Sequence, residues 1–372
     1  MYLHPWRPRK RRRFWMWLLC LAIAFTVSWS LYSKQQDFVA RVRGPLPTPT
    51  PTEISAREYL AVGDAAFWDG RLNDAAHAYS RATELDPMLA AAYSRWARIL
   101  VYRRRTDEAV RIARRAVEVD PNAGESHAVL CMALDWNGQI VEAVAAGIKA
   151  TTVDPEYALG YAYLSEAYGD QGRPIDAWDL AQEAMELEPD NPLVRRNLGY
   201  AYEVSGKYRE AIREYEAVLE MNPNLGFVHI DIGRNYRVLT DLDNAAAAFK
   251  RATEVDPGDA QGYVLYGSVV YAQGDYVEAT QAFQRAVELD PEYGVAHARL
   301  GLAYYMRRNW EDAIVHLERG INLGDRAEEN LVILGLCLSY LDECDRAIPW
   351  FEEALEINPT SPLAKQGLAS CQ

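Results

Sequence analysis

The side chains best suited to chemistry in this 372-residue sequence are its histidines, and their spacing argues against a metal site. His127, His229 and His297 recur at one position of a 34-residue period, in the third, sixth and eighth copies. Helices stacked at that period lie about 10 Å apart, so these imidazoles are too far from one another to share an ion. We therefore predict that they pack within the fold and that the chain holds no metal.

The five cysteines also indicate no metal site, because none of them forms a C-x-x-C pair. Cys337 and Cys344 flank one turn and could form a disulfide in an oxidising compartment, although we favour free thiols. Cys131 replaces a small packing residue and is expected to be inert. The sequence contains no glycine-rich phosphate loop and no Ser/His/Asp set. We therefore predict no catalytic residues, no cofactor and no enzymatic activity.

The distribution of charge excludes a nucleic-acid-binding protein. Residues 1–43 carry nine basic residues and one acid, whereas the remainder carries 30 basic and 52 acidic residues. A body with a net charge of −22 repels phosphate backbones. The hydrophobic content of 49% excludes an intrinsically disordered chain.

The N-terminal part reads as a membrane anchor. Residues 14–33 contain no charge, and as a helix 19 of them rise about 28 Å, close to the hydrocarbon thickness of a bilayer. Trp15, Trp17, Trp29 and Tyr32 stand near its two ends, where amphipathic rings favour the membrane interface. The basic residues within 1–13 resist translocation, which predicts a cytoplasmic N-terminus and an exported body.

Three other interpretations of this segment remain open. A signal peptide could be cleaved after Ala24 or Ser30, although the apolar run continues past the first of these sites. The arginines before Phe14 loosely match a twin-arginine signal, and they also match a nuclear-localisation patch. Because the basic block lies directly against an apolar run, we favour a retained single-pass anchor, with a bacterial envelope as its setting.

Residues 34–55 form the expected linker between the anchor and the body. Within it, residues 44–52 read GPLPTPTPT, which favours polyproline II, a semi-rigid spacer with a rise of about 3.1 Å per residue.

A strict period of 34 residues governs residues 56–361. Proline follows Asp, Glu or Asn at Pro87, Pro121, Pro155, Pro189, Pro223, Pro257, Pro291 and Pro359, with Asp325 at the missing slot. Twelve residues earlier stands alanine: Ala75, Ala109, Ala143, Ala177, Ala211, Ala245, Ala279, Ala313 and Ala347. Twelve residues before that stands a small residue: Gly63, Ala97, Cys131, Ser165, Gly199, Gly233, Gly267, Gly301 and Gly335. Three columns in phase predict nine copies of one unit.

Each copy reads as two helices. In the seventh copy, apolar and small residues from Tyr263 to Val270 keep helical spacing, and Gly274 then interrupts the run. The spacing resumes from Ala279 to Ala286 and ends at Asp290-Pro291. Such a pair leaves an apolar face uncovered, so neighbouring pairs must stack. Residues 362–372 read as a short capping helix in which Leu363 and Leu368 cover the ninth copy.

The pattern resembles the tetratricopeptide repeat (TPR) over residues 56–361. The resemblance implies an all-α, right-handed superhelical solenoid of nine helix pairs. It also implies an inner groove lined by the first helix of each repeat. Residues of this chain at the family's groove positions are Phe67, Trp68, Arg98, Tyr102, Met132, Trp136, Arg196, Tyr200, Phe227, Arg234, Arg237, Tyr271, Tyr305 and Tyr340. From these we select ten candidate binding residues: Phe67, Trp68, Arg98, Tyr102, Trp136, Arg196, Tyr200, Arg234, Tyr271 and Tyr305.

The chain departs from the family pattern in three places. The large aromatic of the second helix is replaced by Ala113, Gly147 and Ala181 in repeats two to four, so we expect the curvature to change there. Repeat eight ends at Gly324 without proline. Pro349 falls inside the second helix of repeat nine, where it is harmless if Asp345 is the N-cap.

The resemblance implies a non-enzymatic, membrane-anchored scaffold that binds a protein or peptide, with a role in envelope assembly or secretion. The lysine and asparagine pattern with which some family members bind chaperone C-termini is absent. Repeat two is rich in arginine and could dock an acidic partner or lipid headgroups, although a solvated face is the favoured interpretation. The alternative function is an accessory subunit of a glycosyltransferase or cell-wall enzyme complex.

Overall fold

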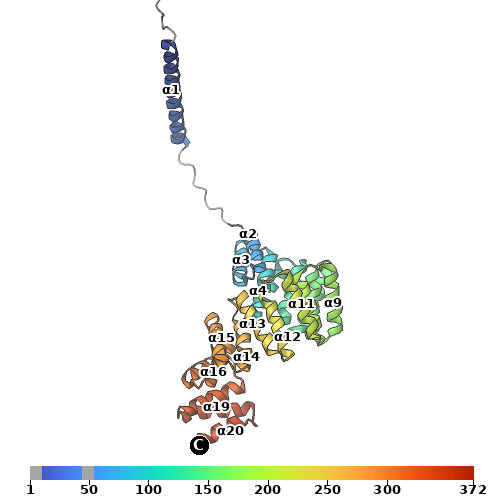
Figure 1. Ribbon diagram of the computed structural model, residues 1–372. Helices are drawn as coiled ribbons and strands as arrows, with labels where there is room; N and C mark the ends of the chain where they lie inside the picture. The colour runs from blue at the N-terminus through green and yellow to red at the C-terminus, as the bar shows by residue number, and fades with distance from the viewer. Residues whose placement is uncertain (1–10, 44–53) are drawn as a thin grey trace, which may run out of the picture. The chain divides into compact units, whose positions relative to one another are not determined.

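In the computed structural model, which describes residues 11–43 and 54–372, the chain is all α-helical (Figure 1). It divides into two units, residues 1–54 and 55–372. The predicted polyproline segment, residues 44–52, and the first residues of the basic block lie outside the described residues.

The first unit contains one long helix, α1 (Arg11–Arg43). Its stretch Met16–Gln35 has a mean hydropathy of 1.6 and is long and apolar enough to cross a membrane, a test that a signal sequence would also pass. The helix continues past the predicted boundary at Ser33, because neither proline nor glycine occurs before Gly44.

The second unit is an array of helix pairs followed by a single helix. The first helices of the nine pairs are α2 (Ala56–Trp68), α4 (Ala90–Tyr102), α6 (Gly124–Trp136), α8 (Ala158–Asp170), α10 (Pro192–Val204), α12 (Gly226–Val238), α14 (Ala260–Ala272), α16 (Gly294–Met306) and α18 (Glu328–Tyr340). The second helices are α3 (Leu72–Leu85), α5 (Thr106–Val119), α7 (Ile140–Val153), α9 (Pro174–Leu187), α11 (Tyr208–Met221), α13 (Leu242–Val255), α15 (Tyr276–Leu289), α17 (Trp310–Asn322) and α19 (Cys344–Ile357). The last helix is α20 (Pro362–Ser370).

The turn within each pair places one residue in the left-handed region. Five repeats use glycine there, with φ between 74° and 88°: Gly70, Gly138, Gly172, Gly206 and Gly274. The other four use Arg104, Thr240, Arg308 and Asp342, with φ between 59° and 61°. A side chain in this region costs roughly 1 kcal/mol relative to glycine. The same turn therefore forms in all nine repeats, with some strain in four of them.

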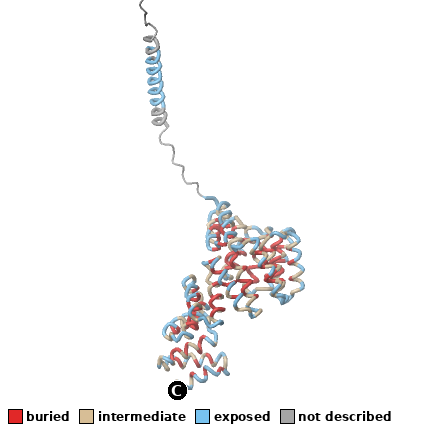
Figure 2. Tube along the Cα trace, in the orientation of Figure 1, coloured by how far each residue is buried: buried red, intermediate tan, exposed pale blue. Residues whose placement is uncertain are grey.

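In the core of these pairs, a small residue on the first helix leaves room for a large side chain on the second helix, a fit that we call volume exchange. In repeat seven, a Cβ atom added to Gly267 would lie 2.7 Å from the ring of Phe283, so only glycine leaves room for that ring. The same fit recurs between Gly63 and Tyr79, Gly199 and Tyr215, Gly233 and Phe249, and Gly335 and Phe351. These rings are all buried, and buried residues follow the interior of the array (Figure 2).

Repeats two to four reverse this exchange. Ala113, Gly147 and Ala181 replace the aromatic side chain, and Ala97, Cys131 and Ser165 replace the facing glycine. The first helices of repeats two to five, α4, α6, α8 and α10, pack directly against one another, whereas α14, α16 and α18 touch at few residues. The packing of these repeats therefore differs from that of repeats seven to nine, and the change of curvature stays a prediction.

Replacing Gly267 by alanine is expected to lower the free energy of unfolding of the repeat unit by about 1–3 kcal/mol, because the new methyl group overlaps the buried Phe283 ring. The measurement is urea denaturation followed by circular dichroism. Gly160→Ala is the matched control, since its Cβ would lie 3.5 Å from that of Ala150, an ordinary contact. The control is expected to be neutral or stabilising by up to about 1 kcal/mol. Equal stability of the two variants would contradict the volume exchange.

Two details at the C-terminal end differ from expectation. The N-cap of α19 is Glu343 rather than Asp345, so Pro349 lies inside the helix, which nevertheless continues to Ile357. The capping helix α20 covers repeat nine through Ala364, Gly367 and Leu368, whereas Leu363 is 53% exposed. Leu363 stands at the second helical position, and Ala364, Gly367 and Leu368 face the core instead.

Candidate partner-binding surface on the inner face of the repeats

The inner face of the first superhelical turn is closed by its own side chains. Phe227 of α12 stacks on Tyr102 of α4 with ring centroids 4.1 Å apart and planes at 9°. Phe67 of α2 stacks on both rings at 6.4 Å. Repeats one, two and six therefore meet across the turn, and their aromatic side chains fill the space between them.

Polar contacts join the same repeats. The Arg103 guanidinium donates two hydrogen bonds to the Asp256 carboxylate, at 2.7 and 3.0 Å. The Asn222 side chain donates to the Trp68 carbonyl at 3.0 Å. Gly70 packs so closely on the Asn224 carbonyl that a side chain there would collide with it. These partners lie about 150 residues apart in sequence, so the closure is a tertiary contact of the whole turn.

A buried ion network crosses repeats three to six. Arg196 Nε donates to Asp231 Oδ2 at 2.7 Å, and Arg196 Nη1 lies 3.3 Å from Glu166 Oε2. Trp136 Nε1 donates to the other oxygen of Glu166 at 3.0 Å. Arg196 and both carboxylates are at least 90% buried as side chains. One guanidinium thus binds two carboxylates inside the turn.

Two further ionisable residues of this interior form no ion pair with the described residues. Arg98 lies with its guanidinium carbon 4.9 Å from the centroid of the Phe67 ring, and its Nε atom has no hydrogen-bond partner. Both carboxyl oxygens of Asp135 are buried and unpartnered. Burial, followed by the neighbouring charges of Glu166 and Asp170, raises the pKa of Asp135 to about 9. Asp135 is therefore a neutral acid at physiological pH.

The predicted groove residues consequently divide into two groups. Phe67, Arg98, Tyr102 and Arg196 are at most 6% exposed and contact this chain itself. Trp136 is half-buried under Arg104, and the half-buried Tyr200 donates its hydroxyl proton to Asp170. In this conformation these six offer little surface to a partner. Arg234, Tyr271 and Tyr305 are half-buried and Trp68 is 38% exposed, so these four remain accessible.

The accessible residues continue along an arm formed by repeats seven to nine (Figure 1). Tyr271 of α14 and Tyr305 of α16 occupy the same position of successive repeats, and Tyr340 of α18, 54% exposed, follows them. Trp310 joins the last two, with ring centroids 5.3 Å from Tyr305 and 4.8 Å from Tyr340. The sequence argument missed Trp310 because it is the first residue of a second helix. We call Tyr271, Tyr305, Trp310 and Tyr340 the aromatic row.

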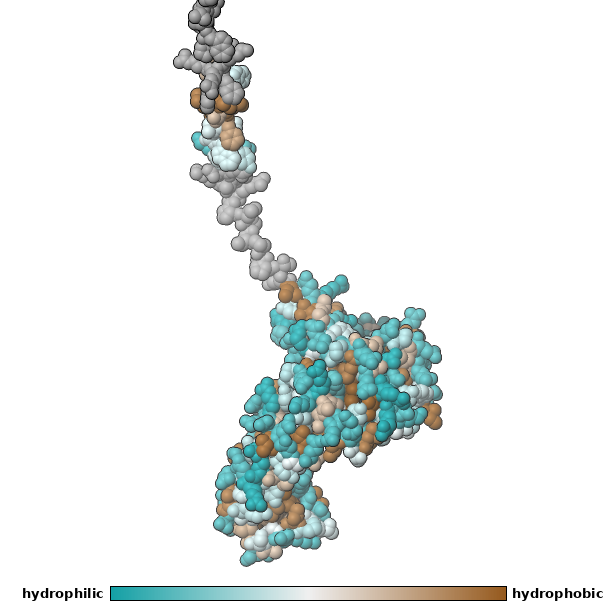
Figure 3. All heavy atoms as spheres, in the orientation of Figure 1, coloured by the Kyte–Doolittle hydropathy of each residue, from teal (hydrophilic) through white to brown (hydrophobic). Residues whose placement is uncertain are grey.

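Two apolar side chains of α16 are also exposed. Val295 and Met306 of α16 are 38% and 39% exposed. Figure 3 shows apolar residues among polar ones over the visible face of the arm. Rings and short apolar chains on one face can bury the apolar side chains of a partner segment.

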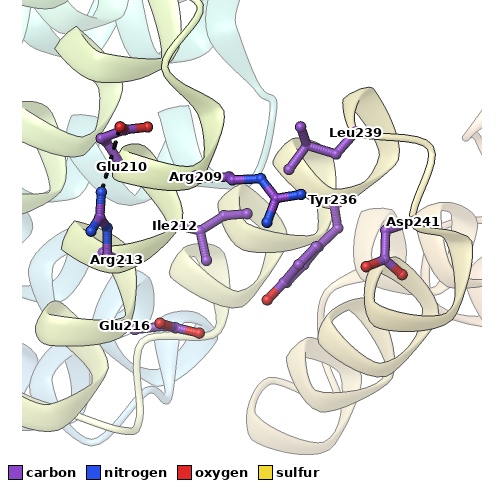
Figure 4. Close-up of a pocket in the computed structure, with 8 residues that line it drawn as sticks. All are labelled: Arg209, Glu210, Ile212, Arg213, Glu216, Tyr236, Leu239 and Asp241. Carbon is purple, nitrogen blue, oxygen red and sulfur yellow. Dashed lines mark ion pairs between the residues drawn. The ribbon is translucent and has the colours of Figure 1, made fainter.

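A separate pocket of about 490 Å³ opens between α11 and α12 (Figure 4). Ile212, Tyr236 and Leu239 supply its apolar wall, and Arg209 points across it towards Tyr236. Its remaining lining is Glu210, Arg213, Glu216 and Asp241. The charged residues of the lining are of both signs. The lining contains neither a nucleophile with an adjacent base nor a phosphate cradle.

His127 and His297 are buried in the fold, as the sequence predicted. Nε2 of His127 lies 2.9 Å from the Pro121 carbonyl oxygen, and Nε2 of His297 lies 3.1 Å from that of Pro291. His297 also contacts His316 through their Nδ1 atoms at 3.1 Å. Among the described residues, no group of three or more His, Cys, Asp or Glu side chains could hold a metal ion.

The disulfide joins a different pair of cysteines from the one considered in the sequence. Cys344 is bonded to Cys371, with Cα atoms 5.2 Å apart, and Cys337 is free and buried. Helix α20 brings Cys371 back to the start of α19, whereas the side chain of Cys337 faces the core. Closing a loop of 27 residues contributes about 3.5 kcal/mol in the chain-entropy description, so the bond fastens the capping helix.

Comparison with known proteins agrees with this architecture. Tetratricopeptide repeat families match residues 230–294, residues 170–230 and 270–328, and residues 329–361. Together these matches run without a gap from residue 170 to residue 361, more than half of the chain. The chain belongs to the tetratricopeptide repeat family. Helix pairs of the same lengths precede residue 170, beginning with α2 and α3.

Solved TPR structures are similar to the array. A chain in the crystal structure of the APC/C hetero-tetramer Cut9–Hcn1 is 17% identical with a TM-score of 0.59, over 80% of this chain and 59% of that chain. This likeness shows the fold alone, and the present chain spans about three fifths of that chain's length. Two crystal structures of MamA are 27% and 26% identical with TM-scores of 0.41, over 43% and 44% of this chain and 93% and 90% of theirs. No curated protein matches the chain.

Proposed function

We propose that this TPR protein is a non-enzymatic, membrane-anchored scaffold that binds a protein partner through the aromatic row of repeats seven to nine. Scaffolding by protein–protein interaction is the general role of TPR domains. We propose further that the array lies on the extracytoplasmic side of the membrane and serves envelope assembly or secretion.

The observation that carries the proposal is the contrast between the two halves of the inner face. In repeats one to six the aromatic side chains stack on one another across the closed turn. In repeats seven to nine, equivalent side chains keep solvent access, up to 54% for Tyr340. Tyrosine and tryptophan supply large contact areas at low conformational-entropy cost and dominate binding hot spots.

The proposed location rests on two independent features. The apolar stretch of α1 follows the basic residues Arg11, Arg12 and Arg13, an order that retains the N-terminus in the cytoplasm. The disulfide between Cys344 and Cys371 is typical of proteins in oxidising compartments.

One capture experiment tests the surface and the location together. The full chain is cross-linked in intact cells with a membrane-impermeant reagent, and the adducts are identified by mass spectrometry. We expect one partner to lose at least tenfold in yield when Tyr271, Tyr305 and Tyr340 are all changed to alanine, because each truncation removes an anchor of about 1–2 kcal/mol.

The matched control is the triple variant Val277→Ala, Val315→Ala and Ile357→Ala. These side chains are 53–60% exposed on the second helices of the same arm. The control should keep the full yield. Equal loss in both variants would refute the aromatic row, and adducts that form only with a permeant reagent would refute the extracytoplasmic location.

A further inference from the structure

The inner face of repeats six to nine is cationic, although the repeat array as a whole is acidic. Its arginines are Arg234, Arg237 and Arg299, joined by Arg104 of repeat two. The acids beside them are Glu329, which lies 3.7 Å from Arg299, and Asp259 and Asp290, which line the same pocket as Arg104. The chain carries 14 more acidic than basic residues. A local excess of arginine beside an aromatic row therefore needs a reason of its own.

Arg104 stands where the closed turn meets the arm. Its Nε atom donates to Gln261 at 3.2 Å, and its guanidinium carbon lies 4.4 Å from the centroid of the Trp136 ring. No carboxylate among the described residues forms an ion pair with it. Desolvation, followed by the charge of Arg234, lowers the pKa of Arg104 to about 10, so the surroundings disfavour its charged form. A bound anion would stabilise that charged form.

Arg234 and Arg237 extend this charge along α12. Among the described residues, Asp231 is the carboxylate that forms an ion pair with Arg234, at 3.6 Å, and Asp231 already binds Arg196 at 2.7 Å. Arg237 is exposed and forms no ion pair with any described carboxylate. Arg237, Tyr271 and Tyr305 occupy the same position of three successive repeats. The cationic residues therefore continue directly into the aromatic row.

We propose that the partner segment, whose existence rests on the function proposed above, is an acidic peptide. Its carboxylates bind Arg104, Arg234 and Arg237, and its apolar side chains lie on the aromatic row. Successive repeats lie about 10 Å apart, and an extended chain covers about 3.3 Å per residue. An extended chain therefore needs about six residues to cross two repeats. We expect the acidic residues of the segment to lie about that far, in either direction, from its apolar anchor.

The test is selection of a random 12-residue peptide library displayed on phage against the full chain in detergent. The expected result is enrichment of peptides in which aspartate and glutamate cluster about six residues from an apolar side chain. The double variant Arg104→Gly and Arg237→Gln should lose that acidic bias and still enrich apolar peptides. Glycine is the residue of five other repeats at the position of Arg104, so this variant should fold.

Arg209→Gln with Arg213→Gln is the control. It removes the same charge from α11, where Arg209 lines the outer pocket and the Arg213 side chain is 69% exposed. The control should retain the acidic bias. Enrichment of peptides without acidic bias by the native chain would overturn the acidic partner and leave the aromatic row standing. If no peptide is enriched by the native chain, both proposals fail.

Discussion

Replacing Arg196 by methionine is expected to lower the free energy of unfolding of the repeat unit by about 3–5 kcal/mol, since it leaves Glu166 buried without a counter-ion and Asp231 with only Arg234 at 3.6 Å. Methionine fills much of the same space, so the loss would report charge rather than volume. Denaturation by urea, followed by circular dichroism at pH 7, measures the change.

Two further variants separate charge from packing at this site. Adding Glu166→Gln and Asp231→Asn to Arg196→Met removes the stranded charges and should recover most of the lost stability, because neutral networks of similar shape are often as stable as buried ion pairs. Arg213→Met, at a side chain that is 69% exposed, should change stability by less than about 0.5 kcal/mol. A triple variant no more stable than Arg196→Met would show that the guanidinium acts by packing alone.

Replacing Asp135 by asparagine is expected to stabilise the protein by about 4 kcal/mol more at pH 8 than at pH 5. The pKa of Asp135 is raised to about 9 in the folded state from 3.8 when exposed. Its contribution is therefore fully present below pH 3.8 and is lost as the pH rises towards 9, by about 1.4 kcal/mol per pH unit. Asparagine has no proton to lose, so its stability should not follow this slope.

Stability curves of the native chain and the variant at pH 5, 6, 7 and 8 measure the effect as a difference, which cancels the titration of other groups. Asp179→Asn, at an exposed carboxylate of α9, is the control and should give a difference close to zero at every pH. A constant difference between the native chain and Asp135→Asn would mean that Asp135 is ionised in the folded state.

These two residues belong to the closed turn, and the closed turn decides which part of the inner face remains for binding. Arg196 ties repeats four, five and six together, and Asp135 faces the same interior from repeat three. If the network were weakened, the stack between Tyr102 and Phe227 would be the contact most directly affected. Stability of the turn and accessibility of the groove are thus two aspects of the same packing.

The sequence by itself determined the repeat architecture. The recurring proline, alanine and small residues make contacts within one helix pair or between adjacent pairs. The residues of each copy therefore specify its own helix pair and its packing on the next one. Even the volume exchange is visible in it, since glycine at Gly267 accompanies Phe283 while Ser165 accompanies Ala181. The family's groove positions also led to Tyr271 and Tyr305, which lie accessible on the arm.

Only the tertiary structure decided which groove residues are buried. The contact of Arg103 with Asp256 spans 153 residues, and it depends on small rotations that accumulate over several repeats. No single repeat encodes that sum, so Phe67 and Tyr102 gave no sign in the sequence that they would be covered. The pairing of Cys344 with Cys371 has the same origin, because the position of the last helix in the fold, rather than the spacing along the chain, determines which cysteine lies next to Cys344.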